Sequence, residues 1–261
     1  MQATSFSYTL SMQMRVLWAL CLREIHGKHG KARLGYFWVL FKTFFGISIF
    51  WFIREKAGFT TPHAMPLPLY LLLGFIPWYI FASGLSMVME AVRTNKALLT
   101  FPQVLPLDLY VSSGLVTWVT EIVVLGLFLL LISLMGYSYK LHDPITLFTM
   151  LVMLGFFAIG LGITLSVLSL YLPVIDRIVP VVLRVMFFVS GLFFSPSQLT
   201  ARFASLIYWN PLINYIEACR GAFCVREPFP EIKMTYITCL TFIFLALGLL
   251  VERYVRAKQN I

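Results

Sequence analysis

Long apolar stretches, separated by short polar segments, run along the chain from residue 34 to residue 251. A helix needs about 20 mostly apolar residues, or roughly 17 to 25, to cross the hydrocarbon core of a membrane. Six stretches meet this length, so the pattern predicts an all-α integral membrane protein with six transmembrane helices. The six predicted spans are 34–53, 69–89, 111–135, 145–170, 178–194 and 235–251.

The segment before the first span, residues 1–33, has a different periodicity. Its apolar side chains recur every three or four residues, which is typical of an amphipathic helix, and they are Leu10, Met14, Leu17, Cys21 and Ile25. We expect this helix to lie in the cytoplasmic interface of the membrane, with its cations near anionic headgroups. A short helix packed on a soluble partner is the alternative. No compact apolar region followed by a cleavage site is visible, so no cleavable signal peptide is expected.

A seventh apolar stretch, residues 206–218, is too short to span and is interrupted by Asn210 and Pro211. Irregular backbone is tolerated at membrane depth only where protein or a water-filled cavity satisfies its polar groups. We therefore expect a re-entrant segment between the fifth and sixth spans, at about 195–223.

The composition excludes a soluble globular or a disordered chain, since 60% of the residues are hydrophobic and only 12% are charged. The 20 Lys and Arg residues outnumber the 11 Asp and Glu residues. In a soluble protein this excess would favour nucleic acid, but here the cations outside the spans collect mainly in alternate connecting segments. Cytoplasmic loops carry such an excess, so we expect both termini to be cytoplasmic and no nucleic-acid partner.

Catalytic and metal-binding patterns are absent from the sequence. The four cysteines, of which only Cys219 and Cys224 suggest a bridge, show no metal-ligand spacing and are expected to be packing residues. No phosphate-binding loop occurs, and the aspartates are scattered over different loops. The chain is therefore not expected to be an enzyme or to bind a cofactor or metal itself.

Three charged residues, Lys42, Glu121 and Arg184, fall inside predicted spans. Charges there are costly and usually face a bundle interior or a water-filled path. Snorkelling is the alternative for Lys42, and internal pairing with one of the cations is the alternative for Glu121. Two cations against one anion suit an anionic cargo. The scarcity of carboxylates disfavours a proton- or sodium-coupled carrier.

Aromatic residues crowd the first and fifth spans. Most such rings pack on lipid or on neighbouring helices, but flat apolar faces also suit sugar rings. The candidates for a conduit lining are Phe37, Trp38, Phe41 and Phe45 in the first span and Phe187 and Phe188 in the fifth.

The connection between the second and third spans, residues 90–109, is more apolar than is usual for a solvent-exposed loop. Residues 91–99 can form a helix, whereas Pro102 and Pro106 stop any extension. An exposed apolar cluster usually marks a contact site, although these side chains can instead fold back onto the bundle. The cluster consists of Leu98, Leu99 and Phe101.

These features, in this order, resemble ABC-2-type exporter permeases of capsular polysaccharide and O-antigen over nearly the whole chain. The resemblance is carried by short motifs whose order and spacing are more specific than any one of them. The motifs are Arg33-Leu34-Gly35-Tyr36-Phe37-Trp38, Asn95-Lys96-Ala97-Leu98-Leu99 with Phe101-Pro102, Asp176-Arg177, Phe193-Phe194-Ser195-Pro196 and Trp209-Asn210-Pro211-Leu212. The prolines that bracket Asp176-Arg177 are a departure that leaves the start of the fifth span uncertain.

The resemblance implies that residues 34–261 form an ABC-2 (type V) exporter domain, present as a homodimer on two copies of a separate cytoplasmic ATPase that binds ATP and magnesium. A coupling helix at about 91–101 would dock on that ATPase, and the first and fifth spans would line the passage. The segment 195–223 would form the periplasmic gate. The coupling residues are Val92, Arg93, Asn95, Lys96, Leu98, Leu99 and Phe101, and the gate residues are Ser195, Pro196, Trp209, Asn210 and Pro211.

The resemblance also implies a place in the bacterial inner membrane and a lipid-linked, acidic capsular polysaccharide as the cargo. A periplasmic co-polymerase or outer-membrane exporter is a further implied partner, besides membrane lipids. The alternatives are a permease for O-antigen, teichoic acid, lipo-oligosaccharide or a drug, and, from other classes, a secondary carrier or a membrane scaffold.

Overall fold

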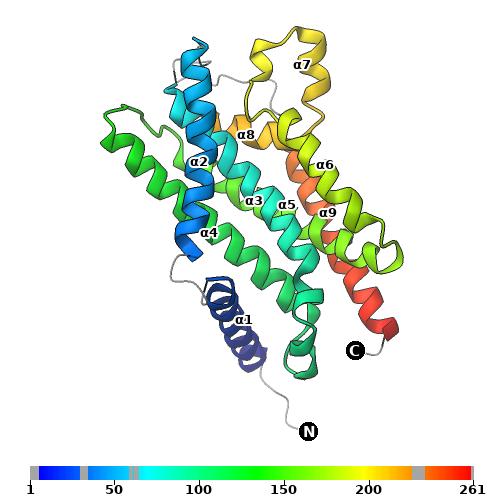
Figure 1. The fold of residues 1–261 in the computed structure, drawn as a ribbon. Coiled ribbons are helices and arrows are strands. Elements are labelled where there is room, and N and C mark those ends of the chain that lie inside the picture. The colour runs from blue at the N-terminus through cyan, green and yellow to red at the C-terminus, as the bar shows by residue number, and fades with distance from the viewer. Residues whose placement is uncertain (1–5, 30–34, 59–60, 62–64, 225–232, 260–261) are drawn as a thin grey trace.

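The computed structural model describes residues 6–29, 35–58, 61, 65–224 and 233–259. This part of the chain is helical and contains no strand (Figure 1). The long helices are α1 (Phe6–His29), α2 (Gly35–Lys56), α3 (Leu67–Thr94), α4 (Pro106–Leu134), α5 (Pro144–Tyr171), α6 (Ile175–Val189) and α9 (Met234–Gln259). The shorter elements are η2 (Lys96–Thr100), η3 (Pro196–Gln198), α7 (Ala201–Ile207) and α8 (Pro211–Gly221).

In the described part of the chain, four helices are long and apolar enough to cross a membrane: α3, α4, α5 and α9. They correspond to the predicted spans 69–89, 111–135, 145–170 and 235–251. The predicted span 34–53 is also a helix, α2. The all-helical membrane architecture predicted from the apolar stretches is thus confirmed.

Proline fixes the first residue of several helices, because its ring suits the first helical turn and its missing N–H is not needed there. Pro106, Pro144 and Pro211 begin α4, α5 and α8. Before α5, the Asp143 carboxylate accepts hydrogen bonds from the amide and the hydroxyl of Thr146, which lower the pKa of this aspartate.

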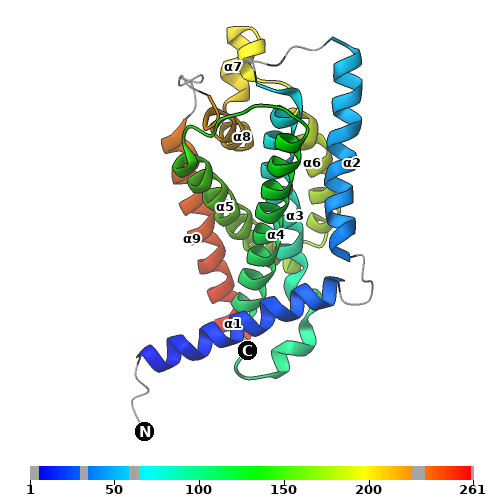
Figure 2. The same cartoon turned by 90° about the vertical axis from the view of Figure 1, so that its left-hand side faces the viewer.

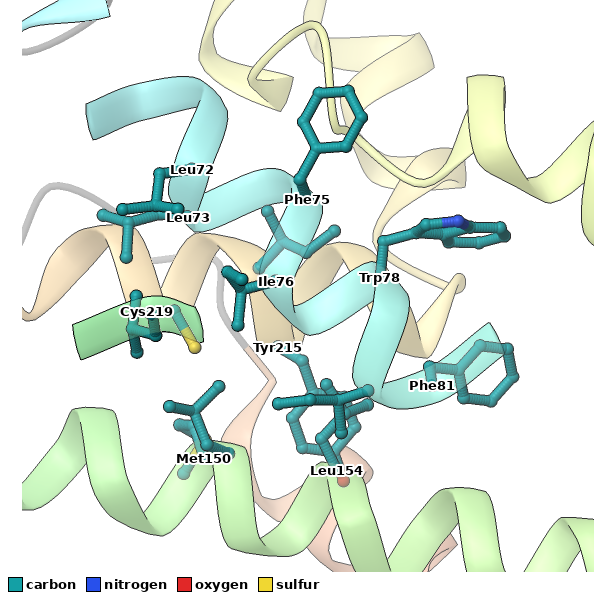
Figure 3. Packing of buried hydrophobic residues seen from close by; sticks show 14 of the residues in the cluster. Leu72, Leu73, Phe75, Ile76, Trp78, Phe81, Met150, Leu154, Tyr215 and Cys219 are labelled. Carbon is teal, nitrogen blue, oxygen red and sulfur yellow. The ribbon is translucent and has the colours of Figure 1, made fainter. Parts of the chain in front are cut away.

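The core forms around α3, which packs against α4, α5, α2 and α8. Figure 3 shows its side chains between α5 and α8. Small residues bring α5 and α9 together: a Cβ on Gly160 would lie 2.6 Å from the Leu245 nitrogen, and one on Gly248 would lie 2.7 Å from the Gly160 oxygen. Such close approach is typical of helix pairs in membranes.

Helix α1 lies across one end of the bundle, beside the α3–α4 connection (Figure 2). The C-terminal end of α9 lies at this same end (Figure 1). Leu20 and Glu24 of α1 are buried. In the predicted apolar stripe, Met14 is 60% exposed, and the neighbouring Trp18 is 67% exposed. This helix therefore buries a narrow face on the bundle and leaves an apolar surface uncovered.

Two predicted boundaries were wrong. The predicted span 178–194 is the 15-residue helix α6, which begins at Ile175 and ends at Val189. Gly191 adopts a φ of +78°, a left-handed conformation that ends the helix and that glycine adopts readily. The predicted coupling helix at 91–101 is not one element, because residues 91–94 are the last turn of α3 and Asn95 separates them from η2.

The segment 195–223 folds into η3, α7 and α8 at the other end of the bundle (Figure 1). Helix α8 lies crosswise there and packs on α3, α5 and α9. Its residues from Leu212 to Arg220 are all buried. The cysteines, Cys219 of α8 among them, are free thiols.

Candidate functional site

An aromatic cluster joins α2, α3 and α6. Phe187 of α6 lies 5.9 Å from Phe75 and 5.6 Å from Trp78, both on α3, between ring centroids. Phe50 of α2 lies 4.3 Å from Phe193, in the loop that follows α6. Of the predicted conduit rings, Phe187 is thus part of the packing between helices.

Other predicted rings face outward. Phe41 and Phe45 stack on each other along α2, 5.6 Å apart, and both are exposed. Phe188 is 62% exposed on α6. The side chains of Phe37 and Trp38 lie outside the part that the structure describes. Among the predicted conduit rings whose side chains the structure describes, Phe41, Phe45 and Phe188 are thus the exposed ones.

Two of the three charged residues predicted inside spans come together. The Lys42 ammonium lies 4.5 Å from the centroid of the Tyr79 ring. Glu121 is only 6% exposed, and its carboxylate interacts electrostatically with both Lys42 and Tyr79. Within the described residues, the Glu121 Oε2 atom makes no hydrogen bond. Lys42, Tyr79 and Glu121 thus lie near one another on α2, α3 and α4, without a direct ion pair between Lys42 and Glu121.

Arg184 lies apart from this group. On α6 it shares one exposed face with Arg177, Val181 and Phe188, at helical spacings of three and four residues. It makes no hydrogen bond or ion pair with any described residue. The α6 face therefore carries two unpaired guanidinium groups among apolar side chains.

The predicted coupling residues divide into two sets. Val92, Leu98 and Leu99 are half-buried and pack on the small core beneath α1, so they fold back in part onto the bundle. Lys96 is exposed, and Phe101 is 59% exposed. Phe101 is therefore the apolar residue of this loop most accessible to a partner.

Arg93 and Asn95 contact other helices of this chain. The Arg93 guanidinium donates to Asp176 at the start of α6 and to Ser169 at the end of α5, each at 2.5 Å. The Asn95 side-chain oxygen accepts from Arg23 of α1 at 2.6 Å. These two residues connect the loop to three helices, α6, α5 and α1.

The predicted gate residues lie at the other end of the bundle. Ser195 and Pro196 are buried, whereas Trp209 is 65% exposed. Asn210 caps α8 by accepting from the Leu212 amide at 3.0 Å, and Pro211 occupies the first turn. Asn210 also donates to Ser190 at 3.2 Å, which ties α8 to the end of α6.

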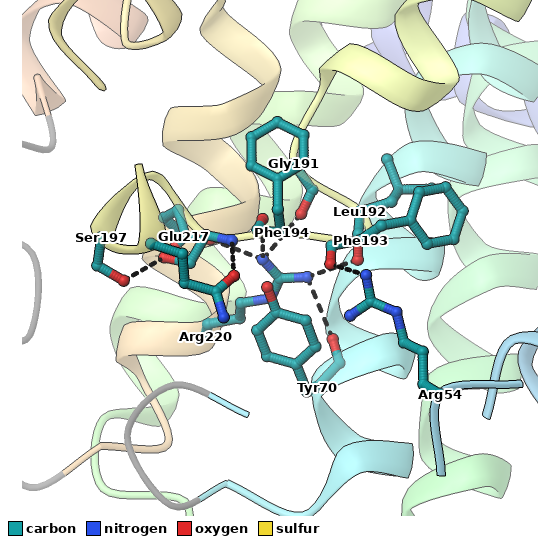
Figure 4. Close-up of polar contacts among 11 residues, drawn as sticks. Arg54, Tyr70, Gly191, Leu192, Phe193, Phe194, Ser197, Glu217 and Arg220 are labelled. Carbon is teal, nitrogen blue, oxygen red and sulfur yellow. Dashed lines mark hydrogen bonds and ion pairs between the residues drawn. The ribbon is translucent and has the colours of Figure 1, made fainter. Parts of the chain in front are cut away.

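The structure reveals a pair at the gate that the sequence interpretation missed. Arg220 is 1% exposed and Glu217 is 0% exposed, and their side chains form an ion pair at 2.6 Å (Figure 4). Arg220 also donates to the carbonyls of Gly191 at 2.9 Å and of Leu192 at 3.0 Å. Its guanidinium stacks over the Tyr70 ring at 3.7 Å. One arginine thus holds the loop after α6 against α3 and α8.

Two further contacts complete this arrangement. We call it the 195–223 polar cluster, and it consists of Arg54, Tyr70, Ser195, Glu217 and Arg220. Glu217 accepts from the Ser195 hydroxyl at 2.9 Å. Arg54 of α2 donates to the Phe193 carbonyl (Figure 4). The signal in the sequence was the spacing of Glu217 and Arg220, which puts opposite charges on one helical face in an apolar stretch.

The bundle of apolar helices defines a polytopic integral membrane protein. Among the residues described, no group of three or more His, Cys, Asp or Glu side chains could hold a metal ion. Residues 15–224 match the family described as ABC-2 type transporter. The chain therefore belongs to the ABC-2 transporter family.

Several curated proteins are similar to the chain over most of both lengths. The polysialic acid transport protein KpsM of Escherichia coli is 26% identical over 238 residues, which cover 90% of this chain and 91% of KpsM. The capsule polysaccharide export inner-membrane protein BexB of Haemophilus influenzae is 25% identical over 260 residues, which cover 98% and 95% of the two chains. The protein CtrC of Neisseria meningitidis serogroup B, of the same description, is 22% identical over 94% of this chain and 93% of its own.

Proposed function

We propose that the chain is the permease subunit of an ATP-driven exporter that moves a lipid-linked capsular polysaccharide across the bacterial inner membrane. The observation that carries this proposal is the family match over residues 15–224, together with three relatives, named for polysialic acid transport or capsule polysaccharide export, that align along at least nine-tenths of the chain. The permease has no nucleotide site of its own, so a separate cytoplasmic ATPase supplies the energy and binds ATP and magnesium. A periplasmic co-polymerase or outer-membrane exporter would receive the polysaccharide.

The passage lies between two copies of the chain in this proposal. Helices α2 and α6 serve as the remaining two of six spans and present uncovered apolar surface, including Phe45 at 53% and Phe188 at 62% exposure. The same surfaces carry Lys42 and Arg184, both exposed. A homodimer would cover these faces and place cations beside an acidic polymer. The exit is formed by the re-entrant segment 195–223.

The ATPase binds at the end of the bundle that carries α1 and η2. Phe101 and Lys96 are exposed there, and an exposed apolar side chain beside a cation suits docking into a groove of a partner. Leu98 and Leu99, which are half-buried, support the loop from beneath.

Replacing Phe101 with glutamate tests this docking. A charge in the centre of a desolvated contact costs several kcal/mol, so we expect co-purification of the ATPase and polysaccharide export to fall by about tenfold or more. The amount of the chain in the membrane should not change, because the side chain is 59% exposed. The matched control is Phe101→Leu, which stays apolar and should retain both. Normal ATPase binding and export by Phe101→Glu would contradict the proposed coupling surface.

The orientation is tested by labelling single cysteines introduced at Lys96 and Lys140 after the four native cysteines are replaced. Lys96 lies in η2 and Lys140 in the exposed α4–α5 connection at the other end of the bundle. With both termini cytoplasmic, an impermeant thiol reagent should label position 140 in intact spheroplasts and position 96 only after permeabilisation. The reverse pattern would overturn the orientation.

A further inference from the structure

Helix α6 is held by polar contacts at its two ends. None of its residues is fully buried, so packing along its length fixes it weakly compared with α3 or α5. At its first turn, Asp176 pairs with Arg93 at 2.5 Å. After its last turn, the carbonyls of Gly191 and Leu192 accept hydrogen bonds from Arg220. The position of α6 therefore depends on these end contacts as well as on one half-buried face, which includes Phe187.

The contact at the first turn leads directly to η2. Arg93 lies three residues before Lys96, in the last turn of α3. Its two terminal nitrogens bind different elements, since Nη1 contacts Asp176 of α6 and Nη2 contacts Ser169 of α5. A charge-assisted, forked contact of this kind fixes direction as well as distance. A shift of the segment around η2 thus reaches α6 through a single side chain.

We propose that the Arg93–Asp176 ion pair is a positioning pair that transmits movement of the η2 segment to α6. This inference rests on the proposed function, in which η2 docks on the ATPase and α6 lines the passage. When the ATPase displaces η2, Arg93 moves the first turn of α6, and α6 then moves relative to the loop that Arg220 holds at its other end. The pair thereby couples movement of η2, where the ATPase is proposed to dock, to the proposed exit segment 195–223.

If the pair had a purely structural role, removing it would destabilise the folded chain. The Arg93 and Asp176 side chains are 35% and 33% exposed, and ion pairs at such positions contribute little to stability because solvent screens them. Their removal should therefore leave the chain folded and inserted. The informative quantity is the amount of polysaccharide exported per ATP hydrolysed.

The test uses the complete complex with Arg93→Asp, with Asp176→Arg and with both changes together. Each single variant should bind the ATPase and hydrolyse ATP, while export per ATP falls by about tenfold, within the usual range of coupling between sites. The double variant restores opposite charges and should recover most of this loss. Asp176→Asn, which keeps the shape of the side chain, should give a smaller loss of the same sign.

Arg253→Gln is the control, because it removes an exposed charge near the same end of the bundle without touching the pair. It should export as the unchanged chain does. Normal export per ATP by the single variants, or no recovery in the double variant, would overturn the inference and leave the proposed function standing. Absence of ATP-dependent export from the unchanged chain would overturn the proposed function and the inference with it.

Discussion

Replacing Arg220 with alanine should destabilise the folded chain by about 3–5 kcal/mol, as expected when one partner of a buried ion pair is removed. The change leaves Glu217, which is 0% exposed, without its cation. It also removes the donors that satisfy the Gly191 and Leu192 carbonyls. The measurement is the midpoint of thermal denaturation of the purified protein in detergent, together with the yield of monodisperse protein.

Matched variants separate charge from geometry at this position. Arg220→Lys keeps the charge but loses the planar fork, so it should fall between alanine and the unchanged chain. The double variant Glu217→Gln with Arg220→Met should be less destabilised than Arg220→Ala, because no buried charge is left uncompensated. Arg202→Ala, on an exposed position of α7, should leave the midpoint unchanged. An Arg220→Ala protein as stable as the unchanged chain would contradict a structural role for the 195–223 polar cluster.

The sequence predicts the long helices well, because apolar length is a local property. The stretch 145–170 became α5 (Pro144–Tyr171), with a proline at its start. The end of α6 was not predictable in this way. Apolar residues resume at Leu192 beyond Ser190 and Gly191, and what ends the helix is the φ of Gly191 and the capture of nearby carbonyls by an arginine from α8. That contact joins residues 29 positions apart and leaves no local pattern.

The candidate site likewise divides into residues that a local pattern reveals and residues whose contacts only the tertiary structure reveals. The presence of a charge inside a predicted span singled out Lys42 and Glu121, and in the structure both interact with Tyr79 of α3. Arg93 and Asn95 were assigned to ATPase docking from their position in a loop, but their side chains contact α6 and α1. Arg220 falls outside the six predicted spans and was not among the candidate site residues. Its burial depends on the crosswise placement of α8, which only the tertiary structure defines.

Deleting this chain from an encapsulated bacterium that depends on it should abolish polysaccharide export completely. In the proposed function the permease moves the polysaccharide and does not make it, so the polymer should accumulate inside the cell. A plasmid copy of the unchanged chain should restore it to the surface. Arg184→Ala should restore export only in part, because the exposed cation on α6 is a proposed contact for the acidic polymer, whereas the exposed control Arg253→Ala should restore it fully.

The most direct test of the central claim is therefore the location of the polysaccharide in cells with and without this chain, measured by staining intact and permeabilised cells. The proposed function predicts internal polysaccharide without the chain and surface polysaccharide with it. Normal surface polysaccharide in the absence of the chain would contradict the proposal that this chain exports it.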